Sequence, residues 1–294
     1  MDLNVIEFSL NISVAIIMLG MGLSLTIADF IRIKEEPRSV AIGLFNQLIM
    51  LPLIGLALIL ALGLKEEYAV GLMLIAACPG GATSNLISNL AKGDIGLSVT
   101  LTAISSVITV VTIPFIVNYA LLKFMSTDTI VQLPYATIFL KILLITVVPV
   151  ALGMLIRGHR EAFAIQMEKP VKIASVVLMA AIIVGAVVTN REQLSTALPI
   201  IGPAVIGLNI LTMLLGFLSG KLLKLKLRQQ VSISIECGIQ NGSLALAIVG
   251  MALTQYKELA LVPATYGVLM FGIGGLFAGY YARLVTINEK KDHA

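Results

Sequence analysis

The feature that most constrains this chain is a series of long apolar blocks separated by short polar connections. Each block approaches the roughly 20 residues that an α-helix needs to cross a lipid bilayer. Charged residues make up only 12% of the sequence, about half the share found in soluble domains. The sequence therefore predicts an all-α polytopic membrane protein in which residues 1–294 form one integral bundle, surrounded by membrane lipid.

We predict nine spans, and the basic residues give their direction. Fifteen of the 20 Lys and Arg residues fall in the connections that follow odd-numbered spans. Cytoplasmic loops are enriched in Lys and Arg, so we expect the N-terminus outside, the C-terminus in the cytoplasm, and a bacterial inner-membrane location. The first block is full length and lacks a basic leader, so no cleavable signal peptide is expected. The predicted spans are 4–28, 39–63, 68–91, 95–122, 133–156, 170–189, 197–223, 229–254 and 260–284.

The stretch from Ser232 to Gly250 carries polar groups in the middle of the eighth span. Glu236 has no Lys or Arg within seven residues, and the amides Gln240 and Asn241 follow it. A carboxylate at membrane depth costs about 2.5–3.5 kcal/mol on insertion scales unless a partner compensates it. That partner could be a distant side chain, a proton or a metal cation.

Spans three and eight share a pattern that predicts interrupted helices. Cys78-Pro79-Gly80 is followed by Asn85, and Cys237-Gly238 is followed by Asn241. The two spans occupy corresponding positions in halves of opposite orientation, which is typical of the midplane binding site of inverted-repeat transporters. The alternative is that both are plain Pro or Gly kinks.

Oxygen-bearing side chains near these breaks could bind a hard cation such as sodium. Ser98, Thr102 and Ser105 are spaced i, i+4 and i+7, so they share one helix face. Their alternative role is bonding back to their own helix carbonyls, and Gln47 could instead form an interhelical hydrogen bond.

Two segments resemble the bile acid:sodium symporter family of sodium-coupled organic-anion transporters. They are GGATSNLISNLAKGDIGLSVTLTAIS and SISIECGIQNGSLALAI. The resemblance implies an inverted-repeat fold with two crossed discontinuous helices, a core domain (39–122 and 197–284) and a panel domain (4–28 and 133–189). Ten-span members have an additional first helix that this chain is expected to lack.

The resemblance also implies two sodium ions that share Glu236, and a net positive site that an organic anion would balance. The first ion site is expected to comprise Ser84, Asn85, Ser98, Thr102 and the Glu236 carboxylate. The second is expected to comprise the side chains of Gln47, Glu236 and Gln240 with the backbone oxygens of Cys237 and Ile239. The substrate is expected near Asn241, Thr83 and Ala82.

The last span departs from some bile-acid-transporting members, because Val268–Phe271 is apolar where they carry a polar pair. A smaller carboxylate, such as a pantoate-like or keto acid, is therefore as plausible as a bile acid. A proton-coupled carrier and a non-coupled channel or sensor remain alternatives. No span carries a nucleophile–base pair or a His/Asp cluster, so we expect no enzyme activity, and neither a nucleic-acid nor an obligate protein partner is indicated.

Overall fold

The structure, a computed structural model, describes residues 3–125 and 135–292. Within these ranges every regular element is a helix, which confirms the predicted all-α membrane class. The elements are α1 (Leu3–Ser24), α2 (Ile27–Glu35), α3 (Pro37–Phe45), η1 (Asn46–Met50), α4 (Leu51–Leu62), α5 (Glu66–Ala77), α6 (Ala82–Leu90), α7 (Ile95–Phe124), α8 (Tyr135–Ile145), α9 (Val147–His159), α10 (Glu161–Thr189), α11 (Arg191–Leu222), α12 (Leu227–Gly238), α13 (Gly242–Ala252), η3 (Lys257–Ala260) and α14 (Leu261–Asp292).

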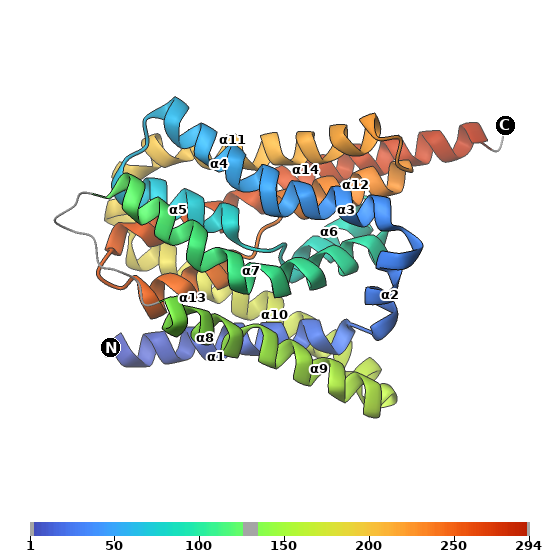
Figure 1. The fold of residues 1–294 in the computed structure, drawn as a ribbon, viewed down its shortest axis with the longest axis horizontal. Coiled ribbons are helices and arrows are strands. Elements are labelled where there is room, and N and C mark those ends of the chain that lie inside the picture. The colour runs from blue at the N-terminus through green and yellow to red at the C-terminus, as the bar shows by residue number, and fades with distance from the viewer. Residues whose placement is uncertain (1–2, 126–134, 293–294) are drawn as a thin grey trace.

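The helices run mainly along the long axis of the molecule, and α1 begins at the end opposite to that at which α14 finishes (Figure 1). Six helices in the described ranges are long and apolar enough to cross a membrane, or seven if the bent α1–α2 pair counts as one span. The predicted count of nine would also require the interrupted pairs α5–α6 and α12–α13 to be spans. That count stays a prediction.

Several predicted span limits differ from the helices. The first helix ends at Ser24, and the next element bends away by 58°. A capping box explains the new start, because Asp29 Oδ2 accepts a hydrogen bond from the Thr26 backbone at 2.7 Å. The sixth predicted span begins earlier than expected, since α10 starts at Glu161 and contains Pro170. Residues 133–134 of the fifth predicted span lie outside the described residues.

The helices pack in two neighbourhoods. Helix α1 packs against α8, α9 and α10, while α11 packs against α4, α12 and α14 and α7 packs against α5 and α12. Helix α13 touches both sets, because it contacts α1 and α10 as well as α14. Helix α12 is almost wholly enclosed, with every residue from Gln229 to Gly238 buried. The division into core and panel domains remains a prediction.

Candidate functional site

The two predicted interruptions are present, and they meet. Helix α5 gives way to α6, and α12 to α13, through short extended segments. Gly80 and Gln240 form an antiparallel bridge between these segments. The Gly81 amide donates to Ile239 O at 2.9 Å, and the Asn241 amide donates to Pro79 O at 3.0 Å. Because the chain leaves the helical path and pairs across the break, neither interruption is a plain kink.

Glu236 lies on the last turn of α12 beside this crossing, with only 1% of its surface exposed. Its carboxylate accepts hydrogen bonds from three hydroxyl groups: Ser84 Oγ at 2.7 Å, Ser98 Oγ at 3.1 Å and Thr102 Oγ1. No Lys or Arg is among the ion-pair partners of this carboxylate in the part of the chain that the structure describes. A buried carboxylate is thus held by neutral donors from α6 and α7.

Two serines near this cluster behave differently from the sequence-based expectation. Ser88 was not predicted, yet its Oγ donates to Ser98 Oγ at 3.2 Å and so extends the network. Its position four residues after Ser84 on α6 was the available signal. Ser105 instead donates to the backbone oxygen of Thr102 at 3.2 Å, which is the back-bonding alternative.

Gly80 lies directly beside the Glu236 carboxylate. A Cβ atom added to Gly80 would lie 1.9 Å from Glu236 Oε1, far inside any permitted contact. The position therefore requires glycine, and the reason is the space occupied by the carboxylate. The sequence motif Pro79-Gly80-Gly81 indicated a bend, but it could not identify this contact.

Gln47 and Gln240 come together at the crossing. Gln47 Nε2 donates to Gln240 Oε1 at 2.8 Å and to Cys78 O at 3.1 Å. Gln240 Nε2 donates in turn to Cys237 O at 2.8 Å. Ile239 O accepts the hydrogen bond from the Gly81 amide described above. The predicted members of the second ion site are thus adjacent to one another.

A local distortion of the second span carries Gln47. The five-residue element η1 has π-helical hydrogen bonding between the α-helical segments α3 and α4. Single π turns inside α-helices are rare and occur frequently at functional sites. The neighbouring Asn46 is used structurally, because its Nδ2 donates to Ile42 O at 2.8 Å and to Ser219 Oγ at 2.9 Å.

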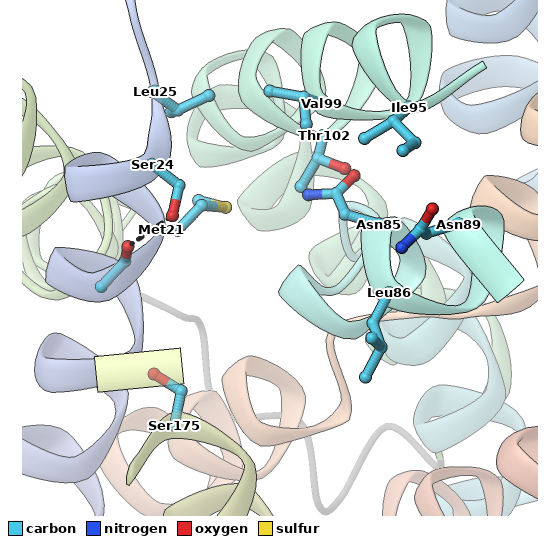
Figure 2. Close-up of a pocket in the computed structure, with 11 residues that line it drawn as sticks. Met21, Ser24, Leu25, Asn85, Leu86, Asn89, Ile95, Val99, Thr102 and Ser175 are labelled. Carbon is cyan, nitrogen blue, oxygen red and sulfur yellow. Dashed lines mark hydrogen bonds between the residues drawn. The ribbon is translucent and has the colours of Figure 1, made fainter. Parts of the chain in front are cut away.

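A cavity of about 330 Å³ lies next to the carboxylate cluster, between α1 and α10 on one side and α6 and α7 on the other. Figure 2 shows Ser175 across the open space from Asn85 and Thr102. Asn85 Oδ1 is buried and has no hydrogen-bond partner among the described residues. Ser175, from α10, was not predicted from the sequence. The lining residues are Gly20, Met21, Ser24, Leu25, Asn85, Leu86, Asn89, Ile95, Val99, Thr102 and Ser175.

A smaller adjoining cavity reaches the starts of α6 and α13, and its lining includes Thr83, Ser175 and Asn241. The hydroxyls of Thr83 and Ser175 are buried without a hydrogen-bond partner in the described ranges. Asn241 Oδ1 caps α13 by accepting from the Leu244 amide at 3.0 Å. Ala82 is the first residue of α6, but its side chain is outside the described part.

Comparisons with known proteins identify the family. A family model described as the sodium bile acid symporter family matches residues 11–197. The chain belongs to the sodium bile acid symporter family. It is 32% identical over 281 residues to an uncharacterized sodium-dependent transporter, YocS, of Bacillus subtilis, spanning 95% of this chain and 85% of that protein. The ileal sodium/bile acid cotransporter of Homo sapiens is 27% identical over 97% of this chain and 82% of its own length.

A further match is the probable chloroplastic sodium/metabolite cotransporter BASS2 of Oryza sativa subsp. japonica. It is 26% identical over 96% of this chain, which spans 66% of that relative's length. The relatives are named as transporters and cotransporters. This member of the family is accordingly a sodium-coupled transport protein and not an enzyme.

Proposed function

We propose that this protein is a secondary active symporter that couples the entry of two sodium ions to the uptake of a small organic anion by alternating access. The observation that carries the proposal is the buried Glu236 carboxylate at the crossing, held by three hydroxyls. Serine and threonine oxygens keep lone pairs while they donate, so these groups supply several hard ligands around one negative charge.

The two ion sites of this proposal share the Glu236 carboxylate. The first comprises Glu236 with Ser84, Ser98, Thr102 and Asn85. Asn85 Oδ1 is buried without a hydrogen-bond partner among the described residues, so its lone pairs are available to a cation. The second comprises Gln47, Gln240, Glu236 and the backbone oxygens of Cys237 and Ile239. Two sodium charges against one carboxylate leave a net charge of about +1, which an anionic substrate balances.

The substrate anion would bind where α6 and α13 begin. Helix N-termini present free amides and a partial positive charge of about 0.5 each, which favours a carboxylate. Ala82, Thr83 and Asn241 lie at these two N-termini. The adjoining cavity of about 330 Å³, which shares Leu86 and Ser175 with the smaller cavity at these N-termini, is at the lower end of the roughly 300–1,000 Å³ typical of small-molecule sites. This size favours a short pantoate-like or keto acid over a bile acid.

With the orientation that the positive-inside asymmetry predicts, the cavity would lie at the cytoplasmic end of a bacterial inner-membrane protein. The cavity is lined by the end of α1 and the start of α7, and Arg32 and Lys92 lie near these same helix ends. At the other end α13 packs against α1, α8 and α10. This arrangement corresponds to a transporter open toward the cytoplasm and closed outside.

The test is uptake of radiolabelled pantoate and of 2-ketoisovalerate into proteoliposomes with a sodium gradient or with choline at fixed pH. We expect sodium-dependent uptake that Glu236→Ala and Gln240→Ala abolish. The matched controls, Glu192→Ala and Gln193→Ala, change the same residue types at exposed positions of α11 and should leave uptake intact. Uptake that persists in choline would instead support a proton-coupled carrier. Unchanged sodium dependence in both buried variants would refute the site assignment.

A further inference from the structure

The break after α12 leaves backbone carbonyls that have no partner within the helix, and each is satisfied in a different way. Cys237 O accepts from the Gln240 side chain, and Ile239 O accepts from the Gly81 backbone. These two oxygens therefore meet groups at the crossing itself. The carbonyl between them, that of Gly238, points to two side chains from other helices.

Asn209 on α11 and Tyr266 on α14 share the Gly238 carbonyl. Asn209 Nδ2 donates to Gly238 O at 2.7 Å, and Tyr266 OH donates to the same oxygen at 2.9 Å. Asn209 Nδ2 also lies 3.1 Å from Tyr266 OH, which closes a triangle of hydrogen bonds. Both side chains are fully buried, at 0% exposure. Among the described residues, no hydrogen bond joins either side chain to Glu236, Gln47 or Gln240.

The Gly238 backbone is also fixed by close packing. A Cβ atom at Gly238 would lie 2.3 Å from Met213 Cγ on α11, so the chain runs directly against that helix. Two hydrogen bonds on the carbonyl and this contact leave the Gly238 peptide little freedom to rotate. Because neighbouring peptide planes are joined at Cα atoms, holding the Gly238 peptide restricts the directions that the Cys237 and Ile239 carbonyls can take.

We propose that Asn209 and Tyr266 are positioning residues for sodium, which hold the broken end of α12 so that Glu236 and the Cys237 and Ile239 carbonyls keep their directions. The proposal rests on the proposed function, because it assumes that these oxygens bind the ions. Outer-shell partners of metal ligands commonly set affinity, and their removal weakens metal binding by about 10–100-fold. Asn209 and Tyr266 occupy that outer position around the α12 break.

A matched control is available on the same two helices. Tyr281 of α14 is also buried, and its hydroxyl lies 2.8 Å from Ser234 Oγ of α12. Tyr281→Phe therefore removes a buried tyrosine hydroxyl bonded to α12, as Tyr266→Phe does, but at a residue four positions before Gly238 and inside the helix. A purely structural role for Tyr266 would make the two variants equivalent.

The experiment measures binding of radioactive sodium to the purified full-length protein, below its unfolding temperature, alongside thermal unfolding in choline. We expect Asn209→Ala to weaken sodium binding about tenfold and Tyr266→Phe to weaken it measurably, while Tyr281→Phe keeps wild-type affinity. The double variant should lose less than the sum of the single effects, because both bonds end on one oxygen. If Asn209→Ala does not fold, the comparison of sodium affinity between Tyr266→Phe and Tyr281→Phe tests the proposal by itself.

Two results would overturn the proposal. One is a lower unfolding temperature in choline for the Asn209 and Tyr266 variants with wild-type sodium affinity. The other is equal weakening of sodium binding by Tyr281→Phe and Tyr266→Phe. Failure of the wild-type protein to bind sodium would overturn the proposed function together with this inference, so the two failures are distinguishable.

Discussion

Gly80→Ala is the sharpest test of the carboxylate's place at the crossing. The added Cβ would stand 1.9 Å from Glu236 Oε1 and 2.6 Å from its carboxyl carbon. Since non-bonded carbon and oxygen atoms do not approach closer than about 3 Å, the carboxylate must retreat by about 1 Å. The Ser84 hydrogen bond of 2.7 Å and the Thr102 hydrogen bond then stretch beyond about 3.2 Å.

Hydrogen bonds to a charged group contribute about 1.5–3 kcal/mol each, so losing one or two costs about 3 kcal/mol. That corresponds to roughly a hundredfold weaker sodium affinity, at 1.4 kcal/mol per factor of ten. Equilibrium binding of radioactive sodium measures the change. Gly275→Ala on α14 is the control, because nothing lies within 4 Å of a Cβ there. Wild-type sodium affinity in Gly80→Ala would show that the carboxylate takes no part in binding the ions.

Two further variants test the ends of the cavity. Ser175→Ala should leave the free energy of unfolding in choline unchanged or raise it by up to about 1 kcal/mol, because the buried hydroxyl has no partner among the described residues. The same variant should bind pantoate about fivefold more weakly. Unaltered pantoate affinity in calorimetry would argue against a role of Ser175 in binding the anion. Lys141 Nζ donates to Met251 O at 2.9 Å, which ties α8 to the last turn of α13. Lys141→Met should speed hydrogen exchange at residues 248–253 by about fivefold, equivalent to about 1 kcal/mol, and unchanged exchange would contradict this role.

The parts of the site that the sequence predicts are those with a local signal. A carboxylate and amides inside an apolar block are recognisable as candidate site residues from the sequence alone. Pro79-Gly80 predicts a helix break without knowledge of the neighbouring helices, because proline removes a helix hydrogen bond. The i, i+4 spacing of Ser98 and Thr102 likewise puts two hydroxyls on one face, and both reach Glu236. These features depend on periodicity and helix chemistry alone, so no neighbour had to be known.

The parts that escape prediction depend on which helices pack together. Asn209 and Tyr266 lie in mostly apolar spans, and only the contact of α11 and α14 with α12 brings them to Gly238 O. The same holds for Ser175, which faces the cavity because α10 lies opposite α6 and α7. The bend after Ser24 is not predicted, because the apolar block continues past this residue. The Thr26–Asp29 capping box that starts the next helix spans only three residues and does not interrupt that block.

Coupling between the ions and the anion has a short physical route at the second break. Gln240 and Asn241 are consecutive, and their side chains belong to different proposed sites. Gln240 bonds to Gln47 and Cys237 O in the second ion site, while Asn241 caps α13 at the anion site. The peptide between them is pinned, because the Asn241 amide donates to Pro79 O at 3.0 Å. A cation that orders Gln240 therefore restricts Asn241 at the predicted anion site.

Thermodynamic linkage turns this route into a measurable equality. If sodium raises the affinity for pantoate by some factor, pantoate must raise the affinity for sodium by the same factor. Calorimetric titration of pantoate at several sodium concentrations, and of sodium at several pantoate concentrations, measures both. Asn241→Ala removes the α13 cap, worth about 1 kcal/mol, and should reduce both factors together while sodium binding alone is retained. If Asn241→Ala weakened pantoate binding but sodium still raised pantoate affinity by the wild-type factor, the coupling would not depend on the Gln240–Asn241 peptide.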